Sequence, residues 1–96
     1  MLKHNFFFDG KVQSIGLVPD GQEQSVMTVG IAVPGVYDFG IITRTEIIEV
    51  TSGEIDINGL LYNPTPGEHL CIIKPGNPVV FTVQKTSSYL CRFPTD

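Results

Sequence analysis

The stretch EIIEVTSGEIDIN, residues 46–58, decides the fold that we expect for this chain. In its first half, Ile48 and Val50 point to one face of an extended chain. After Ser52-Gly53 the alternation resumes, with Ile55 and Ile57 on one face and acidic residues on the other. Alternation of β-branched and acidic residues around a Ser-Gly turn predicts a β-hairpin. Two strands alone bury too little apolar surface to be stable, so further strands are expected to pack over the isoleucine face.

Length and composition indicate one all-β domain. The 96 residues are enough for one core, so we expect a single domain over residues 1–96. Hydrophobic residues make up 42% of the chain, as in folded globular proteins. Its 10 glycines and 7 prolines are scattered, as in chains of short strands joined by turns, and no useful length has helical periodicity.

Charge and cysteine content limit the kinds of partner and the cellular compartment that we expect for this protein. A net charge of −4 argues against a nucleic-acid polymer as partner, because such binding needs a basic surface. No apolar run approaches the length of a membrane span. Phe6-Phe7-Phe8 is too short for the apolar region of a signal peptide and is followed at once by Asp9-Gly10. We therefore expect a cytoplasmic protein in which Cys71 and Cys91 are reduced and buried.

The remaining segments complete a set of short strands. Residues 26–33, VMTVGIAV, are almost entirely apolar, so we expect a strand buried on both faces. Residues 18–25 form the clearest loop, residues 1–5 are expected to be an arm, and residues 6–8 to cover a sheet edge or contact a partner subunit. Eight or nine short strands without a helix are typical of a β-sandwich or barrel. The expected strands outside the hairpin are residues 10–17, 26–33, 36–39, 60–62, 69–74, 79–84 and 88–93.

Four segments carry a resemblance that spans nearly the whole chain: Gly10-Lys11-Val12 with Ser14-Ile15-Gly16; Thr28-Val29-Gly30 through Val33 with Gly35 and Tyr37-Asp38-Phe39; Val50-Thr51-Ser52-Gly53; and Ser88-Tyr89-Leu90-Cys91-Arg92-Phe93. With the later Pro75-Gly76, they resemble a cupin, the all-β jelly-roll barrel. The chain is most similar to the small bacterial single-domain cupins known as pyrimidine/purine nucleoside phosphorylases. The final segment is the most specific. The Gly67-to-Pro75 spacing and Asn77-Pro78 depart from the family pattern.

The resemblance implies a pentosyltransferase without a cofactor. It would convert a nucleoside and inorganic phosphate into a free purine or pyrimidine base and α-D-ribose 1-phosphate. It also implies a homodimer, for which residues 6–8 and the first strand are the expected contact. Two alternatives stay open, because the fold hosts many activities: a non-catalytic cupin that binds a small sugar or metabolite, and a structural dimer module.

A metal site of the usual cupin kind is not expected. Metal-binding cupins present a His-x-His pair, a glutamate and a later histidine inside one barrel. This chain has only His4 and His69, which are far apart in sequence. We expect His69 at the surface or at a strand end, with at most a weak role in binding.

Phosphorolysis needs an anion site and a group that stabilises an oxocarbenium-like sugar. Arg92 is the first anion candidate, because a guanidinium matches phosphate bidentately, and Arg44 is the second. Each could instead lie in solvent. Glu46 and Glu49 are the catalytic candidates, since a carboxylate beside apolar side chains can act as a general acid. The alternative, that both lie on the solvent face of a sheet, stays open.

The further substrate-binding candidates are aromatic or hydroxylic. Tyr37 and Phe39 share a face and could stack a nucleobase of any identity, or belong to the core. Ser88 begins the family's most specific segment. Tyr89 is expected in the core, where its hydroxyl would need a partner. Cys91 is not expected to be a nucleophile, because neither histidine is predicted beside it.

Overall fold

The computed structural model describes residues 1–64 and 70–95 and confirms the all-β prediction. No helix in these two ranges could cross a membrane. The described residues form ten strands: β1 (Leu2–Phe7), β2 (Val12–Leu17), β3 (Met27–Ala32), β4 (Gly35–Ile41), β5 (Glu46–Ser52), β6 (Ile55–Ile57), β7 (Leu60–Tyr62), β8 (Cys71–Ile73), β9 (Pro78–Val83) and β10 (Ser87–Arg92).

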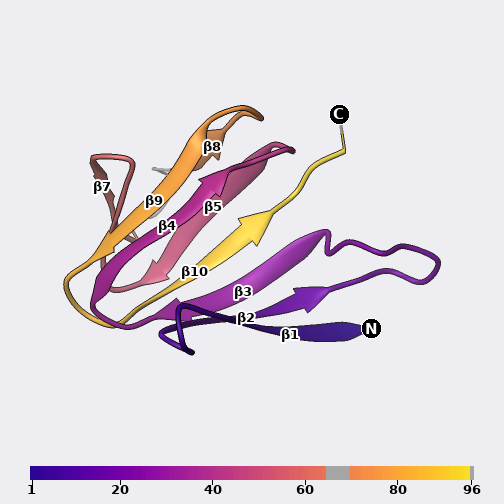
Figure 1. The fold of residues 1–96 in the computed structure, drawn as a ribbon, viewed down its shortest axis with the longest axis horizontal. Coiled ribbons are helices and arrows are strands. Elements are labelled where there is room, and N and C mark those ends of the chain that lie inside the picture. The colour runs from indigo at the N-terminus through magenta and orange to yellow at the C-terminus, as the bar shows by residue number, and fades with distance from the viewer. Residues whose placement is uncertain (65–69, 96) are drawn as a thin grey trace.

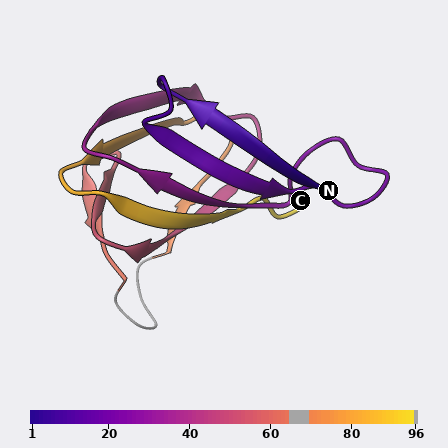
Figure 2. The ribbon, with the colours of Figure 1, turned by 90° about the horizontal axis from the view of Figure 1, so that it is seen from below.

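The strands form two antiparallel sheets that enclose a shared interior. The larger sheet has six strands in the order β1-β2-β3-β10-β5-β8, and the smaller has four in the order β4-β9-β6-β7 (Figure 1). Seen from below, the sheets curve around the interior as a barrel (Figure 2). Both termini and the loop between β2 and β3 lie toward the same end of the long axis in both views.

The predicted hairpin at residues 46–58 is wrong, although its alternation is correct. β5 pairs with β10 and β8 in the larger sheet, whereas β6 pairs with β7 and β9 in the smaller one. The turn between them is a corner from one sheet to the other, at Gly53 with φ 74°. The Ser87 hydroxyl fastens this corner, because its Oγ accepts from the Glu54 amide and donates to the Glu54 carbonyl, both at 2.9 Å. The isoleucines of this segment would face the same interior in a hairpin and in a corner between sheets. The alternation of apolar and acidic residues therefore could not distinguish these two structures.

Two expectations about the N-terminal half also differ from the structure. Residues 1–5 are no arm: β1 is an edge strand whose register with β2 runs from Leu2↔Leu17 to Phe7↔Val12. β3 is not buried on both faces, since Val29 and Ile31 are 51% and 50% exposed on its outer side. An apolar run in the sequence cannot distinguish a strand covered by its own chain from one whose outer face is bare.

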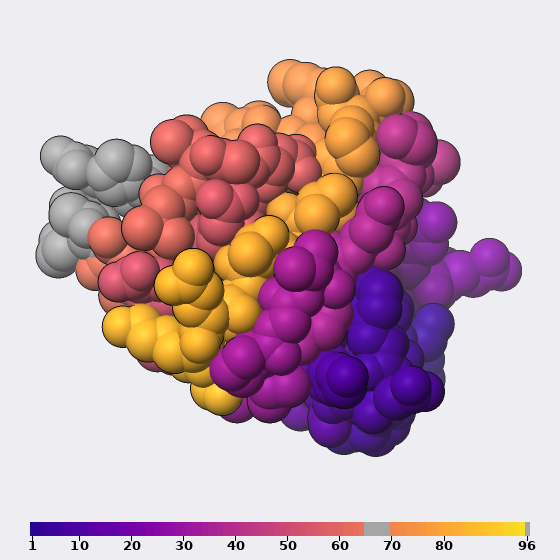
Figure 3. Space-filling model, turned by 60° about the vertical axis from the view of Figure 1, so that its left-hand side comes forward, coloured from indigo at the N-terminus to yellow at the C-terminus, as the bar shows by residue number. Residues whose placement is uncertain are grey.

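Aromatic rings join the two sheets across the interior. Phe81 of β9 lies between Phe39 of β4 and Tyr89 of β10, with ring centroids 5.0 and 5.2 Å away in edge-to-face geometry. Such pairs stabilise a core beyond the area that they bury. Phe7 and Phe8 bring β1 onto the same cluster, each in edge-to-face contact with Phe39. In Figure 3 the indigo N-terminal segment accordingly lies against the magenta segment.

Candidate active site

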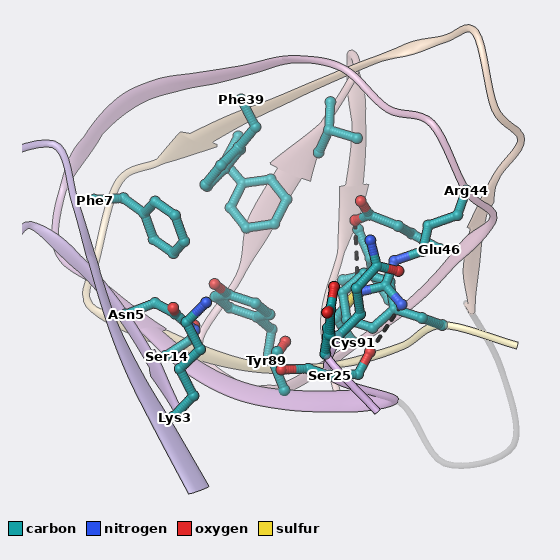
Figure 4. A pocket seen from close by; sticks show the side chains of 17 residues that line it. Lys3, Asn5, Phe7, Ser14, Ser25, Phe39, Arg44, Glu46, Tyr89 and Cys91 are labelled. Carbon is teal, nitrogen blue, oxygen red and sulfur yellow. Dashed lines mark hydrogen bonds between the residues drawn. The ribbon is translucent and has the colours of Figure 1, made fainter. Parts of the chain in front are cut away.

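The interior of the barrel contains a cavity of about 290 Å³ between the two sheets (Figure 4). Its wall comes from β1, β2, β3, β5 and β10 on one side, from Phe39, Val79 and Phe81 on the other, and from the β2–β3 loop at residues 23–25. This volume lies near the lower end of the range of small-molecule sites, roughly 300–1,000 Å³. The cavity can therefore hold a compact metabolite but not a polymer.

One end of the cavity is aromatic. Phe7, Phe39 and Phe81 line it, and the Phe7 and Phe39 centroids are 5.9 Å apart. Phe39 is only partly buried, so its ring is available to a ligand. Tyr37, the other predicted stacking residue, does not line the cavity. It is buried, and its hydroxyl bonds to the backbone oxygens of Val33 at 2.6 Å and Pro34 at 3.1 Å.

The middle of the cavity wall is polar but uncharged. Asn5, Ser14, Gly30 and Tyr89 are register partners across four adjacent strands, and three of them carry hydrogen-bonding side chains. Asn5 Nδ2 donates to Ser14 Oγ at 3.3 Å. This row separates the aromatic end from the charged end that follows.

The charged end contains Glu46, which shares the inward face of β5 with Ile48. Burial raises the pKa of Glu46, while a hydrogen bond from the Cys91 thiol and the charge of Arg44 oppose that rise. Cys91 Sγ donates to Glu46 Oε1 at 3.5 Å. Glu46 is therefore a partly desolvated carboxylate inside the barrel. Of the two alternatives left open by the sequence, the structure supports a carboxylate beside apolar side chains and not one on the solvent face of a sheet.

Arg44, on the connection between β4 and β5, lines the same end of the cavity. Its Nη1 donates to the Ser25 carbonyl at 2.8 Å, and its Cζ lies 3.7 Å from the centroid of the Phe93 ring. These contacts fix the guanidinium plane, and a cation over a ring face is itself favourable. Arg44 makes no other hydrogen bond within the described residues, so its remaining donors are free for an anion. Lys3, on the wall formed by β1, is a second cation of the cavity lining, and Figure 4 shows it on the side of Asn5 and Ser14.

The two thiols are free and cannot bridge. Cys71 and Cys91 are buried, as predicted, and both are register partners of Ile48 from opposite sides of β5. They therefore lie two strand spacings apart, about 9–10 Å, beyond the Cα separation of roughly 7 Å that a disulfide allows. Burial raises the pKa of both thiols, and for Cys91 the nearby Glu46 charge raises it further. A neutral Cys91 is a poor nucleophile but a suitable hydrogen-bond donor to Glu46.

Three of the predicted site residues lie on the outer side of the larger sheet. Arg92 Nη2 and Glu49 Oε1 form an exposed ion pair at 3.3 Å. The Ser88 hydroxyl is 2.7 Å from that of Thr51 and 2.6 Å from that of Ser52. None of the three candidates lines the cavity, because residues 89 and 91 of β10 point inward and its even-numbered residues point outward. His69 lies outside the described residues.

Several residues of the cavity wall were missed from the sequence, namely Lys3, Asn5, Ser14, Ser25, Thr28 and Phe93. Lys3, Asn5 and Phe7 alternate with outward residues, so a period-two pattern was present across residues 1–5, which we expected to be an arm, and residues 6–8, which we expected to cover an edge or a partner. Tyr89 was expected only as a core residue. Its place in the wall depends on which side of β10 faces the cavity.

Solved structures confirm the cupin fold. A protein of unknown function from Vibrio parahaemolyticus is 25% identical, with a TM-score of 0.76, and the match covers 98% of this chain and 99% of that one. A Cupin_2 domain of an XRE family transcriptional regulator from Enterobacter cloacae is 16% identical, with a TM-score of 0.55, and the match covers 99% of this chain and 97% of that one.

Relatives in sequence share one description. A protein of Pseudomonas fluorescens named pyrimidine/purine nucleoside phosphorylase is 40% identical over 96 residues, 97% of this chain and 98% of the relative. One of the same name from Pseudomonas entomophila is 46% identical over 57 residues, 59% of this chain and only 56% of the relative. The family described as pyrimidine/purine nucleoside phosphorylase matches residues 2–93. The chain therefore belongs to the pyrimidine/purine nucleoside phosphorylase family.

Proposed function

We propose that this protein is a nucleoside phosphorylase that accepts purine and pyrimidine nucleosides. The observation that supports it best, beside family membership, is the order of chemistry along one cavity. An aromatic end, an uncharged polar row and an Arg44–Glu46 end follow one another. A nucleoside with phosphate at its C1′ presents a flat base, a polyol and an anion in that order.

The aromatic end suits a base of any identity. The rings of Phe7, Phe39 and Phe81 offer stacking surface but no hydrogen-bond donor or acceptor. Stacking on an aromatic ring is tolerant of sequence because every base has a π-face. In this assignment the base is held by its shape and its ring faces, which gives broad base specificity.

The charged end suits the phosphate and the developing cation. Arg44 binds hydrogen phosphate, and a phosphate oxygen attacks C1′ as the C1′–N bond breaks. The base leaves with that bond's electron pair and takes up the proton of the hydrogen phosphate. Ionised Glu46 stabilises the positive charge that builds on the sugar, which is the electrostatic role of a preorganised group.

The test measures base release from uridine, cytidine, adenosine and guanosine, with and without phosphate. Arg44→Ala has a matched control in Arg92→Ala, because the chain has one arginine in the cavity and one outside it. We expect phosphate-dependent release that falls by about 10²–10³ in Arg44→Ala, as when a transition-state donor is removed, and by less than about twofold in Arg92→Ala.

Two results would contradict this assignment. Absence of phosphate-dependent release with folded protein would leave the non-catalytic, metabolite-binding cupin as the better description. Equal losses of base release in the two arginine variants would leave the phosphorylase assignment standing but would refute the placement of the phosphate site at Arg44 in the cavity.

We also propose that the protein is a homodimer formed through the outward side chains of β1–β3. This outer face carries no formal charge at neutral pH, and Phe6 is 62% exposed on it. Apolar patches of this kind are uncommon on monomers, and a neutral sheet face can pack on an identical copy without burying a charge. Its members are Leu2, His4, Phe6, Gln13, Ile15, Leu17, Met27, Val29 and Ile31.

The structure divides the predicted contact at residues 6–8, because Phe7 and Phe8 pack inward on Phe39 and only Phe6 belongs to the outer face. In sedimentation at micromolar concentration we expect a dimer, and a monomer for Ile31→Lys. A wild-type monomer would refute the interface.

We further propose a cytoplasmic location, which the two free thiols support. Reducing compartments preserve unpaired cysteines, and Cys71 and Cys91 cannot pair with each other in this fold. Fractionation of cells that produce the full chain tests this location, and recovery outside the cytoplasm would refute it.

A further inference from the structure

Tyr89 lines the cavity, and its hydroxyl forms no hydrogen bond with any other described residue. The residue is only 6% exposed, yet within the described part of the chain its oxygen has no hydrogen-bond partner. No fully enclosed side-chain oxygen or nitrogen of the described residues lacks a partner, so this hydroxyl must border the cavity. Because it borders the cavity, this hydroxyl is accessible to a ligand and can donate a hydrogen bond to a ligand oxygen.

The hydroxyl is held in place by the backbone beneath it. Gly30 of β3 is the register partner of Tyr89, and a Cβ added there would lie 2.5 Å from the Tyr89 hydroxyl oxygen. The ring therefore lies flat over a strand position that has no side chain. Figure 4 shows its hydroxyl end directed toward Asn5 and Ser14, the next members of the same row.

The row offers donors and acceptors but no charge. Burial raises the pKa of Tyr89, so its hydroxyl stays protonated and can donate. Ser14 Oγ accepts from Asn5 at 3.3 Å and keeps its own proton to donate, while the Asn5 amide oxygen can accept. Neutral groups that both donate and accept suit the hydroxyls of a sugar better than an anion.

We propose that Asn5, Ser14 and Tyr89 form a subsite for the ribose hydroxyls, in which the Tyr89 hydroxyl donates to the 2′- or 3′-oxygen of the nucleoside. This assignment rests on the proposed function and deepens it. It requires that the sugar lie between the base on the phenylalanines and the phosphate at Arg44, which is where the row lies along the cavity wall.

The test is a thermodynamic cycle that removes the Tyr89 hydroxyl from the protein and one hydroxyl from the sugar, singly and together. It measures whether the two losses of binding free energy are coupled. Tyr89→Phe keeps the ring over Gly30 and removes only the oxygen. Dissociation constants are measured by calorimetry for uridine, 2′-deoxyuridine and 3′-deoxyuridine without phosphate, so that no turnover occurs. Tyr62→Phe is the matched control, because Tyr62 lies outside this cavity.

We expect Tyr89→Phe to weaken uridine binding by about tenfold, the loss of one net hydrogen bond, and Tyr62→Phe to leave it unchanged. One of the two deoxynucleosides should bind about tenfold more weakly to the wild type and lose nothing further in Tyr89→Phe. Ser14→Ala repeats the cycle with a second member of the row, and coupling to a sugar hydroxyl is again expected.

An equal loss for all three nucleosides in Tyr89→Phe, with no coupling in Ser14→Ala, would overturn the subsite. The enzyme assignment is judged separately by base release with phosphate. Coupling without base release would support the sugar subsite and refute the phosphorylase. Base release without coupling would keep the phosphorylase and overturn the subsite. Failure of the wild type to bind any of the three nucleosides would overturn the subsite as well.

Discussion

Replacement of Gly30 by alanine tests the placement of Tyr89 directly. The new methyl group would lie 2.6 Å from Tyr89 Cε1 and 2.5 Å from its hydroxyl oxygen, closer than packed atoms allow. Tyr89 cannot simply rotate away, because its ring packs edge-to-face on Phe81 at 5.2 Å and the residue is buried. The ring or strand β3 must therefore shift.

The magnitude follows from two opposing effects. Overpacking a filled interior costs about 1–3 kcal/mol in the free energy of unfolding. Alanine in place of glycine within a strand would by itself stabilise the protein by roughly 0.5–1 kcal/mol. When Tyr89 is leucine, the far end of the ring is gone and only the second effect remains. Gly30→Ala should thus destabilise the wild type and stabilise a Tyr89→Leu background.

The assay is urea unfolding of four proteins at one protein concentration: the wild type, Gly30→Ala, Tyr89→Leu and the double variant. Their urea midpoints are compared provided that the dependence of the free energy of unfolding on urea concentration has the same slope in all four. Tyr89→Phe is an additional background in which the clashing ring carbons remain, so Gly30→Ala should still destabilise it. If Gly30→Ala had the same effect with tyrosine and with leucine at position 89, the packing of this ring on β3 would be refuted, and with it the rigid placement of the hydroxyl.

Further predictions concern the corner and the buried carboxylate. Ser87→Ala should lower the free energy of unfolding by about 1–3 kcal/mol in urea unfolding, because the Glu54 amide loses its acceptor, while Ser88→Ala, at a half-buried residue on the outer side of the sheet, should cost less than about 1 kcal/mol; equal losses would show that the corner does not depend on Ser87. Burial raises the pKa of Glu46 above 4.5, so the folded protein binds more protons than the unfolded chain in the window above that value, and stability should fall as pH rises through it. Urea midpoints measured between about pH 4 and about pH 8 should lose this fall in Glu46→Gln but keep it in Glu49→Gln, whose side chain is exposed; a fall that persists in Glu46→Gln would assign it to another group.

The sequence predicted the faces of individual strands better than the partners of those strands. It assigned Ile48, Val50, Ile55 and Ile57 to one side, and all four are buried. It joined the two halves of this segment as a hairpin, whereas they lie in different sheets. Side-chain alternation depends only on the local backbone. Pairing depends on hydrogen bonds with strands from elsewhere in the chain, such as β10 beside β5.

The candidate site shows the same division. Arg44, Glu46 and Phe39 were expected from residue type and pattern, and all three line the cavity. Arg92 was the first anion candidate, ahead of Arg44, but the alternation of β10 places it outside, in a pair with Glu49. Which of two faces turns inward is decided by the second sheet that covers one of them, and no local pattern contains that information.

By itself the sequence determined the all-β class, the positions of most strands, the family and the inward set of isoleucines and valines. These depend on composition, turn residues and period-two spacing, which act over a few neighbouring residues. Only the tertiary structure decided that Asn5, Ser14, Gly30 and Tyr89 form one row, because their alignment depends on the registers of three strand pairs. Residues that are distant in sequence become one surface only when backbone hydrogen bonds set those registers. The chemistry of the cavity is therefore a property of the assembled sheet.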